Sequence, residues 1–300
     1  MGEDAILHKV LAKLHRDRDT VLGPGDDCAV LAFGGKWLLA ATDQVSSGVH
    51  YDPATTSPEE IAAKVLKRNL SDIAAMGGVP RWALLALAAT AREDGWLERF
   101  FAGLEATAQQ YDVTVAGGDL GSLPGAERCE YAALTILGEV EEAKLCRRDR
   151  ARVGETLMVT GELGNTLASG HHLTFAPRLA EGRFLAGDWT HCMMDLSDGL
   201  GQDLRRLGRA SEVAFALEGT QLPCRAGADL RGALGDGEDY ELVFTVAPER
   251  VEALFAAWPF ATRLSAVGSV TGGEPGSWTL RAGDETLTDR EVAGYEHFRA

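Results

Sequence analysis

The segment SPEEIAAKVLKRNLSDIAAMGG, residues 57–78, has the clearest structural boundaries in this sequence. Ser57 is suited to cap the start of a helix, Pro58 to occupy its first turn, and Glu60 to complete a capping box with Ser57. The two glycines that close the segment are typical of residues that come after a helix. We therefore predict a helix over residues 58–76, and the rest of the chain is interpreted in relation to it.

Asp72 is the residue of this helix that a packed core does not explain. At 100° per residue, Asp72 falls on the apolar arc, so it is expected to face the core. An unpaired buried carboxylate is costly, and either an arginine or a metal ion would neutralise it. The alternative is that the helix breaks at Asn-Leu-Ser-Asp and that Asp72 caps a second helical segment. The residues on the arc are Ile61, Val65, Asn69, Asp72, Ile73 and Met76.

On both sides of the helix, apolar segments of strand length alternate with segments of helical period. A polar, arginine-rich segment over residues 141–154 separates two such series, and we place a domain boundary there. The prediction is an α+β fold of two α/β-type domains, 1–142 and 150–300, the second a mixed α/β domain. Strands are predicted at 28–33, 37–42, 82–89, 113–116, 131–140, 156–160, 213–217, 240–247, 263–270 and 277–281, and further helices at 4–15, 94–111, 164–172, 198–210 and 248–258.

The composition excludes several classes of protein. Forty-five acidic against 29 basic residues give a net charge of −16, which would repel a nucleic-acid backbone. The longest uncharged apolar stretch is too short to span a bilayer, and the N-terminus lacks a signal-peptide pattern. The five cysteines form no C-x-x-C pair, which argues against a disulfide framework or a structural zinc site. We expect a cytoplasmic protein without a membrane or nucleic-acid partner.

Acidic residues recur where predicted strands meet glycine-rich turns. Asp26 and Asp27 enter the strand predicted at 28–33, and alternation along a strand lets only one of them face a shared site. Thr42 and Asp43 are expected at the end of the next strand. Isolated carboxylates at loop ends suit Mg²⁺, which takes hard oxygen ligands and shares them with substrate phosphates. For any one of these turns, a solvated acidic turn is the simpler interpretation.

Two further acidic segments occur later in the chain. Gly118 and Asp119 are expected where a strand ends, so that the backbone can approach a ligand closely, with a plain tight turn as the alternative. In the segment DLSDG that begins at Asp195, Ser197 or Asp198 is expected to cap the next helix. A helix N-terminus also favours phosphate oxygens, so this segment is a second candidate for phosphate binding.

Common phosphate-binding loops do not explain these acids. The pattern G-x-x-x-x-G-K-[ST] is absent from the sequence, and the glycines at 161 and 164 lack the third glycine of a dinucleotide fingerprint. The run RRDRAR at residues 147–152 stands out in so acidic a chain. It is suited to clamp phosphates with its guanidinium groups, or it is a solvated segment between domains.

Taken in order, six segments resemble the signature of the thiamine-monophosphate kinase family. The resemblance extends over nearly the whole chain, as far as Phe298. It implies membership of the ATP-binding superfamily that includes aminoimidazole ribonucleotide synthetase and selenophosphate synthetase, in which N-terminal domains pair their sheets into a homodimer. The segments are GPGDDCAV, TD, NLSDIAAMGG, GGD, DLSDGL and GEDYEL, which begin at residues 23, 42, 69, 117, 195 and 237.

The resemblance also implies a set of site residues, in which several Mg²⁺ ions join ATP to thiamine monophosphate. Two positions depart from the family pattern: Ala41 stands where some members have a serine, and Asp236 interrupts a Gly-Gly pair. Metal ligands are expected at Asp27, Thr42, Asp43, Asp72, Asp119, Asp195 and Asp198, nucleotide contacts at Gly118, Asp119, Arg148 and Ser197, thiamine monophosphate contacts at His50, Glu238 and Tyr295, and catalytic roles at Asp43, Asp72, Asp119 and Arg148.

The reaction that the resemblance implies transfers the γ-phosphoryl group of ATP to the phosphate of thiamine monophosphate, which gives thiamine diphosphate and ADP. A phosphate monoester with a second pKa of about 6 is mostly ionised at neutral pH, so no general base is required. Catalysis then depends on alignment and charge neutralisation, with Arg148 as an added cation. The alternatives are another ATP-using enzyme of the superfamily, a non-catalytic nucleotide-binding protein, or a hydrolase.

Overall fold

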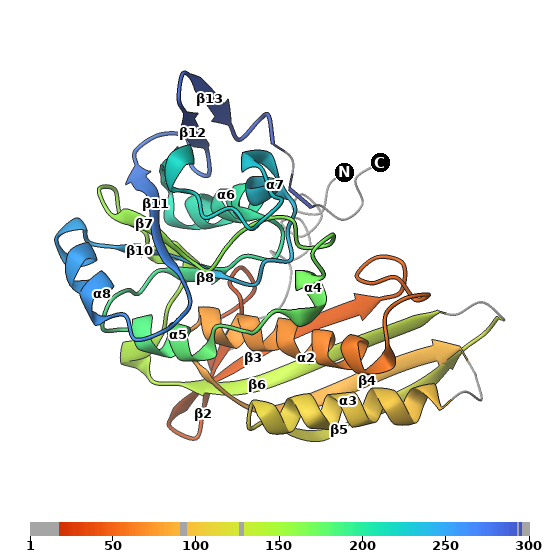
Figure 1. The fold of residues 1–300 in the computed structure, drawn as a ribbon. Coiled ribbons are helices and arrows are strands. Elements are labelled where there is room, and N and C mark those ends of the chain that lie inside the picture. The colour runs from red at the N-terminus through yellow and green to blue at the C-terminus, as the bar shows by residue number, and fades with distance from the viewer. Residues whose placement is uncertain (1–17, 91–94, 126–128, 293, 296–300) are drawn as a thin grey trace.

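The computed structural model describes residues 18–90, 95–125, 129–292 and 294–295. These residues form two β-sheets, one from each half of the chain, and each sheet carries helices (Figure 1). The predicted α+β class with two α/β-type halves is confirmed. The helix predicted at 4–15 lies outside the described residues, and the domain limits at 142 and 150 stay predictions.

The first sheet has the strand order β1-β2-β3-β6-β4-β5 in the described part of the chain. Strands β4 and β5 are parallel and joined through α3, while the other neighbouring strands are antiparallel. Helices α2 and α3 cover one face of this sheet (Figure 1), and the opposite face exposes apolar side chains such as Trp82 and Leu84. The elements are β1 Thr20–Leu22, β2 Ala29–Phe33, β3 Lys36–Ser46, α2 Pro58–Ala75, β4 Val79–Thr90, α3 Trp96–Gln110, β5 Thr114–Leu123 and β6 Glu130–Val140.

Helix α2 confirms the prediction made from its cap residues. The Ser57 hydroxyl accepts a hydrogen bond from the Glu60 N–H at 3.3 Å, and the Glu60 carboxylate accepts one from the Ser57 N–H at 2.8 Å. Both bonds of a capping box are therefore present, and two otherwise unpaired N–H groups are satisfied. The helix continues unbroken to Ala75, so the alternative in which Asp72 caps a second helix is wrong.

The second sheet has the strand order β13-β12-β9-β11-β7-β10-β8 in the described residues. Its neighbouring strands are antiparallel except for the parallel pair β9 and β12. The elements are η1 Glu142–Lys144, η2 Arg148–Arg150, β7 Thr156–Thr160, α4 His171–Thr174, α5 Leu179–Leu185, β8 Met193–Asp195, α6 Leu200–Ser211, β9 Ala214–Glu218, η3 Gly219–Gln221, α7 Leu230–Gly235, β10 Leu242–Val246, η4 Pro248–Arg250, α8 Val251–Ala257, β11 Leu264–Thr271, β12 Trp278–Ala282 and β13 Glu285–Thr288.

Helix α2 lies between the two halves of the molecule (Figure 1). Its residues Ile61 and Val65 belong to the core of the first half. Ala74 and Ala75, at its C-terminal end, belong to an apolar cluster with Leu185 and other residues of the second half. One helix thus contributes to two cores, and polar residues on its flank face the boundary between the halves.

Three element predictions differ from the structure. The strand predicted at 37–42 extends to Ser46 and the one at 113–116 extends to Leu123, because main-chain pairing with β6 and β4 continues past the expected turns. Of the helix predicted at 164–172, the structure forms only α4.

The sequence predicted neither a membrane-spanning segment nor a disulfide framework. Within the described ranges, no helix is both long and apolar enough to cross a lipid bilayer. All five cysteines lie in the described residues and are free thiols, as predicted.

Candidate active site

Three aspartates from separate elements meet at the boundary between the halves. Asp27 precedes β2, Asp72 lies on α2 and Asp195 ends β8. One carboxylate oxygen of each lies within 4.8 Å of the others. The structure thus brings together three of the predicted metal ligands. We call Asp27, Asp72 and Asp195 the carboxylate cluster.

Burial and mutual repulsion raise the pKa of carboxyls in this cluster. For Asp72, burial is the largest cause, followed by the charges of Asp43 and Asp195. For Asp195, burial is followed by the charge of Asp27. Both pKa values lie well above the usual range although Arg148 lowers them, so this arginine does not offset the full charge of the ionised cluster. A divalent cation with a preference for hard oxygen ligands, such as Mg²⁺, fits this donor set.

Two polar side chains of α2 support the acidic residues around them. The Ser71 hydroxyl donates to Asp195 Oδ2 at 2.6 Å in a buried position. Asn69 accepts a hydrogen bond from the Asp43 N–H at 3.1 Å, and its amide donates to the Val65 carbonyl at 2.8 Å. The Asn-Leu-Ser-Asp stretch therefore orients two of the predicted ligands in addition to supplying Asp72.

Arg148 contacts both acids of the Asp26-Asp27 pair. Its guanidinium forms an ion pair with Asp27, and its Nε lies 3.7 Å from Asp26. The main-chain N–H of Arg148 donates to Asp26 Oδ2 at 3.1 Å. Of the two acids, Asp27 belongs to the carboxylate cluster, as predicted, whereas Asp26 contacts Arg148. Both residues lie in a bend before β2, so strand alternation is not the reason for this difference. Burial and the charge of Asp27 raise the pKa of Asp26 to about 7.

Thr42 and Asp43 lie inside β3 and not at its end, so their side chains point to opposite faces of the sheet. Asp43 faces α2, where Arg68 donates to its Oδ2 at 3.1 Å. The Thr42 hydroxyl is on the exposed face, 2.8 Å from that of Thr135. Of the two, Asp43 has its side chain on the face toward Asp72.

Gly118 and Asp119 also lie inside a strand, β5, so the prediction that the strand ends before them is wrong. A Cβ at Gly118 would lie 1.9 Å from the Leu85 carbonyl oxygen, so this glycine permits close pairing with β4. The registers align Asp43 with Leu134, Leu85 and Gly118, which places β5 three strand spacings, about 14 Å, from β3. Asp119 is exposed on the opposite face, away from the carboxylate cluster of its own chain.

The Ser197-Asp198 segment follows β8 directly, but neither residue caps α6. The N-cap of α6 is Gly199, which has no side chain to donate or accept. Instead the Asp203 carboxylate accepts from the N–H groups of Ser197 and Asp198, each at 3.0 Å. Arg206 pairs with Asp198 and also with Asp203 at 3.1 Å. The capping prediction is therefore wrong: α6 has no side-chain cap, and Asp203 holds the segment that precedes the helix.

The three predicted thiamine monophosphate contacts line one cavity. His50 comes from the first half, whereas Glu238 and Tyr295 come from the second. The N–H of Ser46 donates to His50 Nδ1 at 3.1 Å, so the neutral imidazole carries its proton on Nε2. The cavity is lined by Val49, His50, Arg68, Leu167, Ser197, Asp198, Asp236, Gly237, Glu238, Tyr240 and Tyr295. It therefore brings Ser197, a predicted nucleotide contact, and Asp198, a predicted metal ligand, beside the predicted substrate contacts.

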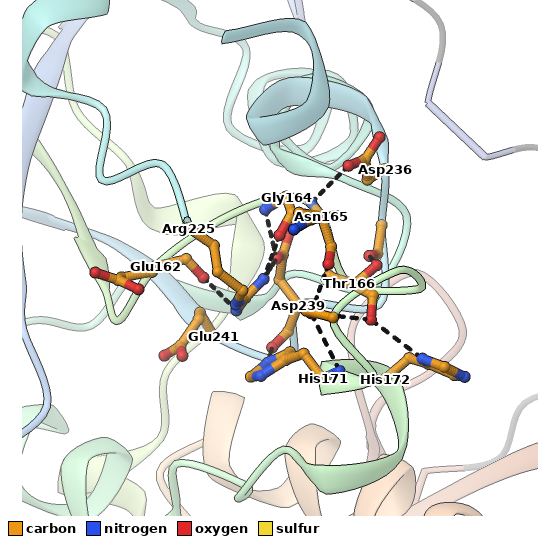
Figure 2. Close-up of polar contacts among 12 residues, drawn as sticks. Glu162, Gly164, Asn165, Thr166, His171, His172, Arg225, Asp236, Asp239 and Glu241 are labelled. Atoms are coloured by element: carbon orange, nitrogen blue, oxygen red, sulfur yellow. Dashed lines mark hydrogen bonds and ion pairs between the residues drawn. The ribbon is translucent and has the colours of Figure 1, made fainter. Parts of the chain in front are cut away.

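The turn that carries Glu238 is held on one side by buried polar contacts (Figure 2). The N–H of Gly164 donates to Asp239 Oδ1 at 2.9 Å, and Arg225 pairs with the same oxygen at 3.1 Å. His171 Nε2 donates to the Asp239 carbonyl at 3.0 Å. Burial raises the pKa of Asp239 to about 7. These contacts join the turn to the segment after β7.

Asp236, which departs from the family pattern, lines the cavity and is also part of this polar network. Its Oδ2 accepts a hydrogen bond from the Asn165 N–H at 2.6 Å (Figure 2). The departure therefore adds a contact between the turn and the segment after β7.

Lys64 and Lys67 are buried residues of the site region that the sequence prediction missed. Lys64 contacts Glu238, and Lys67 donates to the carbonyl oxygens of Leu173 and Phe175 at 2.8 and 2.9 Å. A lysine on an amphipathic helix is normally assigned to solvent, so no local pattern marks them. Their position on α2, on the side that faces the second half, is visible only once the two halves are placed together.

Comparisons with known proteins agree with the resemblance. Residues 25–140 match the family described as AIR synthase related protein, N-terminal domain. The chain is 32% identical to the thiamine-monophosphate kinase of Synechococcus elongatus, with 91% of each chain covered. It is also 32% identical to that of Escherichia coli, with 99% of this chain and 98% of the relative covered.

Solved structures give the same result for the fold. A structure of AaThiL complexed with AMPPCP and TMP has a TM-score of 0.79 at 27% identity and covers 99% of this chain and 97% of its own. The thiamine-monophosphate kinase of Stenotrophomonas maltophilia has a TM-score of 0.73 at 30% identity and covers 95% of this chain and 98% of its own. Through sequence identity over nearly its full length, this chain belongs to the thiamine-monophosphate kinase family.

Proposed function

We propose that this protein catalyses ATP-dependent phosphorylation of thiamine monophosphate to thiamine diphosphate. The observation that carries the proposal is the adjacency of the carboxylate cluster and the cavity lined by His50, Glu238 and Tyr295. The structure of AaThiL, of which 97% aligns with this chain, was solved with AMPPCP and TMP. We interpret these ligands as an ATP analogue and thiamine monophosphate. An oxygen of the acceptor phosphate forms a bond to the γ-phosphorus, and the bond to the β,γ-bridging oxygen breaks to release ADP.

The residues of this chain orient two anions and offset their repulsion. His50, Glu238 and Tyr295 bind the thiamine monophosphate, and Gly118, Asp119, Arg148 and Ser197 contact the nucleotide in this proposal. Arg148 already lies beside the cluster, so its guanidinium is close to where phosphate oxygens gather. No side chain is required to remove a proton, because the acceptor phosphate is mostly ionised at neutral pH.

We further propose Mg²⁺ as the cation at this site. Asp27, Asp72 and Asp195 would hold it directly, and Asp43 and Asp198 are further candidate ligands of the same ion. When bound, Mg²⁺ supplies charge neutralisation and alignment of the phosphate oxygens. Asp43, Asp72, Asp119 and Arg148 are the residues to which we assign catalytic roles.

A cytoplasmic homodimer is part of the proposal. The outer face of the first sheet exposes Trp82, Leu84 and Tyr131, an apolar surface suited to a second copy of the chain. Asp119 lies on this same face, so in such a dimer it would lie at the interface between the two chains. The five free thiols fit a reducing compartment.

The test is product formation from ATP and thiamine monophosphate with MgCl₂, followed by chromatography of thiamine diphosphate and ADP. Asp43→Ala is the matched variant, and its loss of turnover excludes a contaminating kinase. ADP formed equally with water alone would identify a hydrolase, and turnover only with aminoimidazole substrates would identify another enzyme of the superfamily. Nucleotide binding without any product would identify a non-catalytic protein, and each of these three results would reject the proposal.

A further inference from the structure

Lys64 of α2 has a fully buried side chain whose ammonium contacts both walls of the cavity. The Nζ atom lies 2.8 Å from Glu238 Oε1 and donates to Oε2 at 2.9 Å. It also donates to the main-chain carbonyl of His50 at 2.5 Å. One cation therefore joins the two residues that are proposed to bind thiamine monophosphate, one from each half of the molecule.

Glu238 needs such a contact because its backbone is strained. Gly237, Glu238 and Tyr240 have φ values of 71°, 57° and 51°, a region that residues with a Cβ rarely adopt. Strained residues of this kind persist only when surrounding contacts hold them. Asp239 and its partners hold the turn from the second half (Figure 2), and Lys64 holds it from the first.

The burial of Lys64 is costly, which argues against a purely space-filling role. Burial lowers its pKa to about 8, although the charge of Glu238 acts in the opposite direction. An apolar side chain of similar length would fill the same space without this cost. The ammonium is therefore useful for the groups it orients: a carboxylate that is still partly exposed toward the cavity, and the carbonyl beside the His50 ring.

Lys67 provides an internal comparison. It lies one turn further along α2 and is also buried, and its ammonium binds the Leu173 and Phe175 carbonyls and lies 4.7 Å from the centre of the Phe175 ring. Burial lowers its pKa to about 8 as well. Among the described residues, its hydrogen bonds go to neither Glu238 nor His50, so it shares the burial and the charge of Lys64 but not its partners.

We propose that Lys64 is a positioning residue for the acceptor substrate: it sets the orientation of Glu238 and of the His50 segment across the cavity. This inference rests on the proposed function of the cavity. It predicts a specific defect in the use of thiamine monophosphate, whereas ATP binding and the phosphoryl-transfer step are unaffected, because the carboxylate cluster does not contact Lys64.

The test compares Lys64→Met with Lys67→Met in steady-state kinetics, with urea unfolding of both variants alongside. For Lys64→Met we expect KM for thiamine monophosphate to rise about 10-fold or more, with kcat and KM for ATP changed less than about 3-fold. Lys67→Met is expected to lose folding stability while keeping KM for thiamine monophosphate. If Lys64→Met does not fold, Lys64→Gln, which keeps two N–H donors without the charge, is used in the same comparison.

A double-variant cycle with Glu238→Gln identifies the partner through which Lys64 acts. If Lys64 acts through Glu238, adding Glu238→Gln to Lys64→Met raises KM much less than the product of the single effects. Equal KM values in Lys64→Met and Lys67→Met would overturn the inference, and multiplicative effects in the double variant would overturn the role that it gives to Glu238. A wild-type protein that forms no thiamine diphosphate would instead reject the proposed function, so the two failures are distinguishable.

Discussion

Asp72→Asn tests whether the carboxylate cluster is a cation site. The substitution keeps the shape of the side chain and removes one of three charges whose oxygens lie within 4.8 Å of one another. Without a divalent cation, the variant is expected to be more stable than the wild type, because a source of repulsion is gone. With Mg²⁺, the wild type is expected to gain more stability than the variant, because it keeps all three ligands.

The size of the effect is set by the geometry of the cluster. Two full charges 4.8 Å apart repel by about 3.5 kcal/mol at an effective dielectric constant of about 20, and Asp72 has two such neighbours. The raised pKa of Asp72 shows that protonation relieves much of this repulsion in the cation-free protein. We therefore expect Asp72→Asn to raise the free energy of unfolding by about 1–3 kcal/mol. Each kcal/mol corresponds to a rise of about 2–4 °C in Tm.

The assay is thermal unfolding followed by circular dichroism, first in EDTA and then over a series of MgCl₂ concentrations at constant ionic strength. Asp188→Asn is the control, since its carboxylate is 75% exposed and lies 3.4 Å from Lys144 at the surface. The expected pattern is a higher Tm in EDTA for Asp72→Asn and a smaller rise with MgCl₂, with the control unchanged. A variant that is less stable in EDTA, yet gains as much from MgCl₂ as the wild type, would refute the cation site.

Three further predictions concern the sheet, the polar network and the dimer. Gly118→Ala is expected to cost about 2–4 kcal/mol in urea unfolding, because its Cβ would meet the Leu85 carbonyl at 1.9 Å; Gly117→Ala, whose nearest contact is 3.7 Å, is the control, and equal costs would argue against this cause. Burial lowers the pKa of His171 from 6.5 to about 4. As the pH drops from 6.5 to about 4, the imidazole is protonated in the unfolded chain before it is protonated in the folded one, so the free energy of unfolding falls. His171→Gln should flatten the fall in urea midpoint, and parallel pH curves would contradict this. Leu84→Glu on the outer sheet face should shift sedimentation from dimer to monomer, and an unchanged dimer would place the interface elsewhere.

The sequence was sufficient to predict those structural features that are stabilised by residues close together in the chain. The capping box of α2 uses Ser57 and Glu60, three residues apart, and both of its bonds are present. The apolar arc that placed Asp72 toward the interior also holds, because a helix keeps its period regardless of the elements that pack against it.

The errors occurred where distant partners determine the outcome. The strand predicted at 113–116 was expected to end at Gly117 to Asp119, but the hydrogen-bonded ladder with β4 keeps these residues in the strand. The cap of α6 was assigned to Ser197 or Asp198, whereas the N-cap is Gly199 and the N–H groups of Ser197 and Asp198 donate to Asp203 of the helix. Lys64 had no sequence signal, because its partner Glu238 lies 174 positions away in the chain.

The position of α2 has a consequence for synthesis of the protein. Residues 58–75 leave the ribosome well before Asp195 and Glu238, so Lys64 and Asp72 spend an interval without the groups that surround them in the finished molecule. During that interval, the helix presents an ammonium and a carboxylate to water on the side that later becomes an interior. In the nascent first half, this side of α2 is therefore exposed to solvent. The binding site forms only after the second half has been translated and has packed against it.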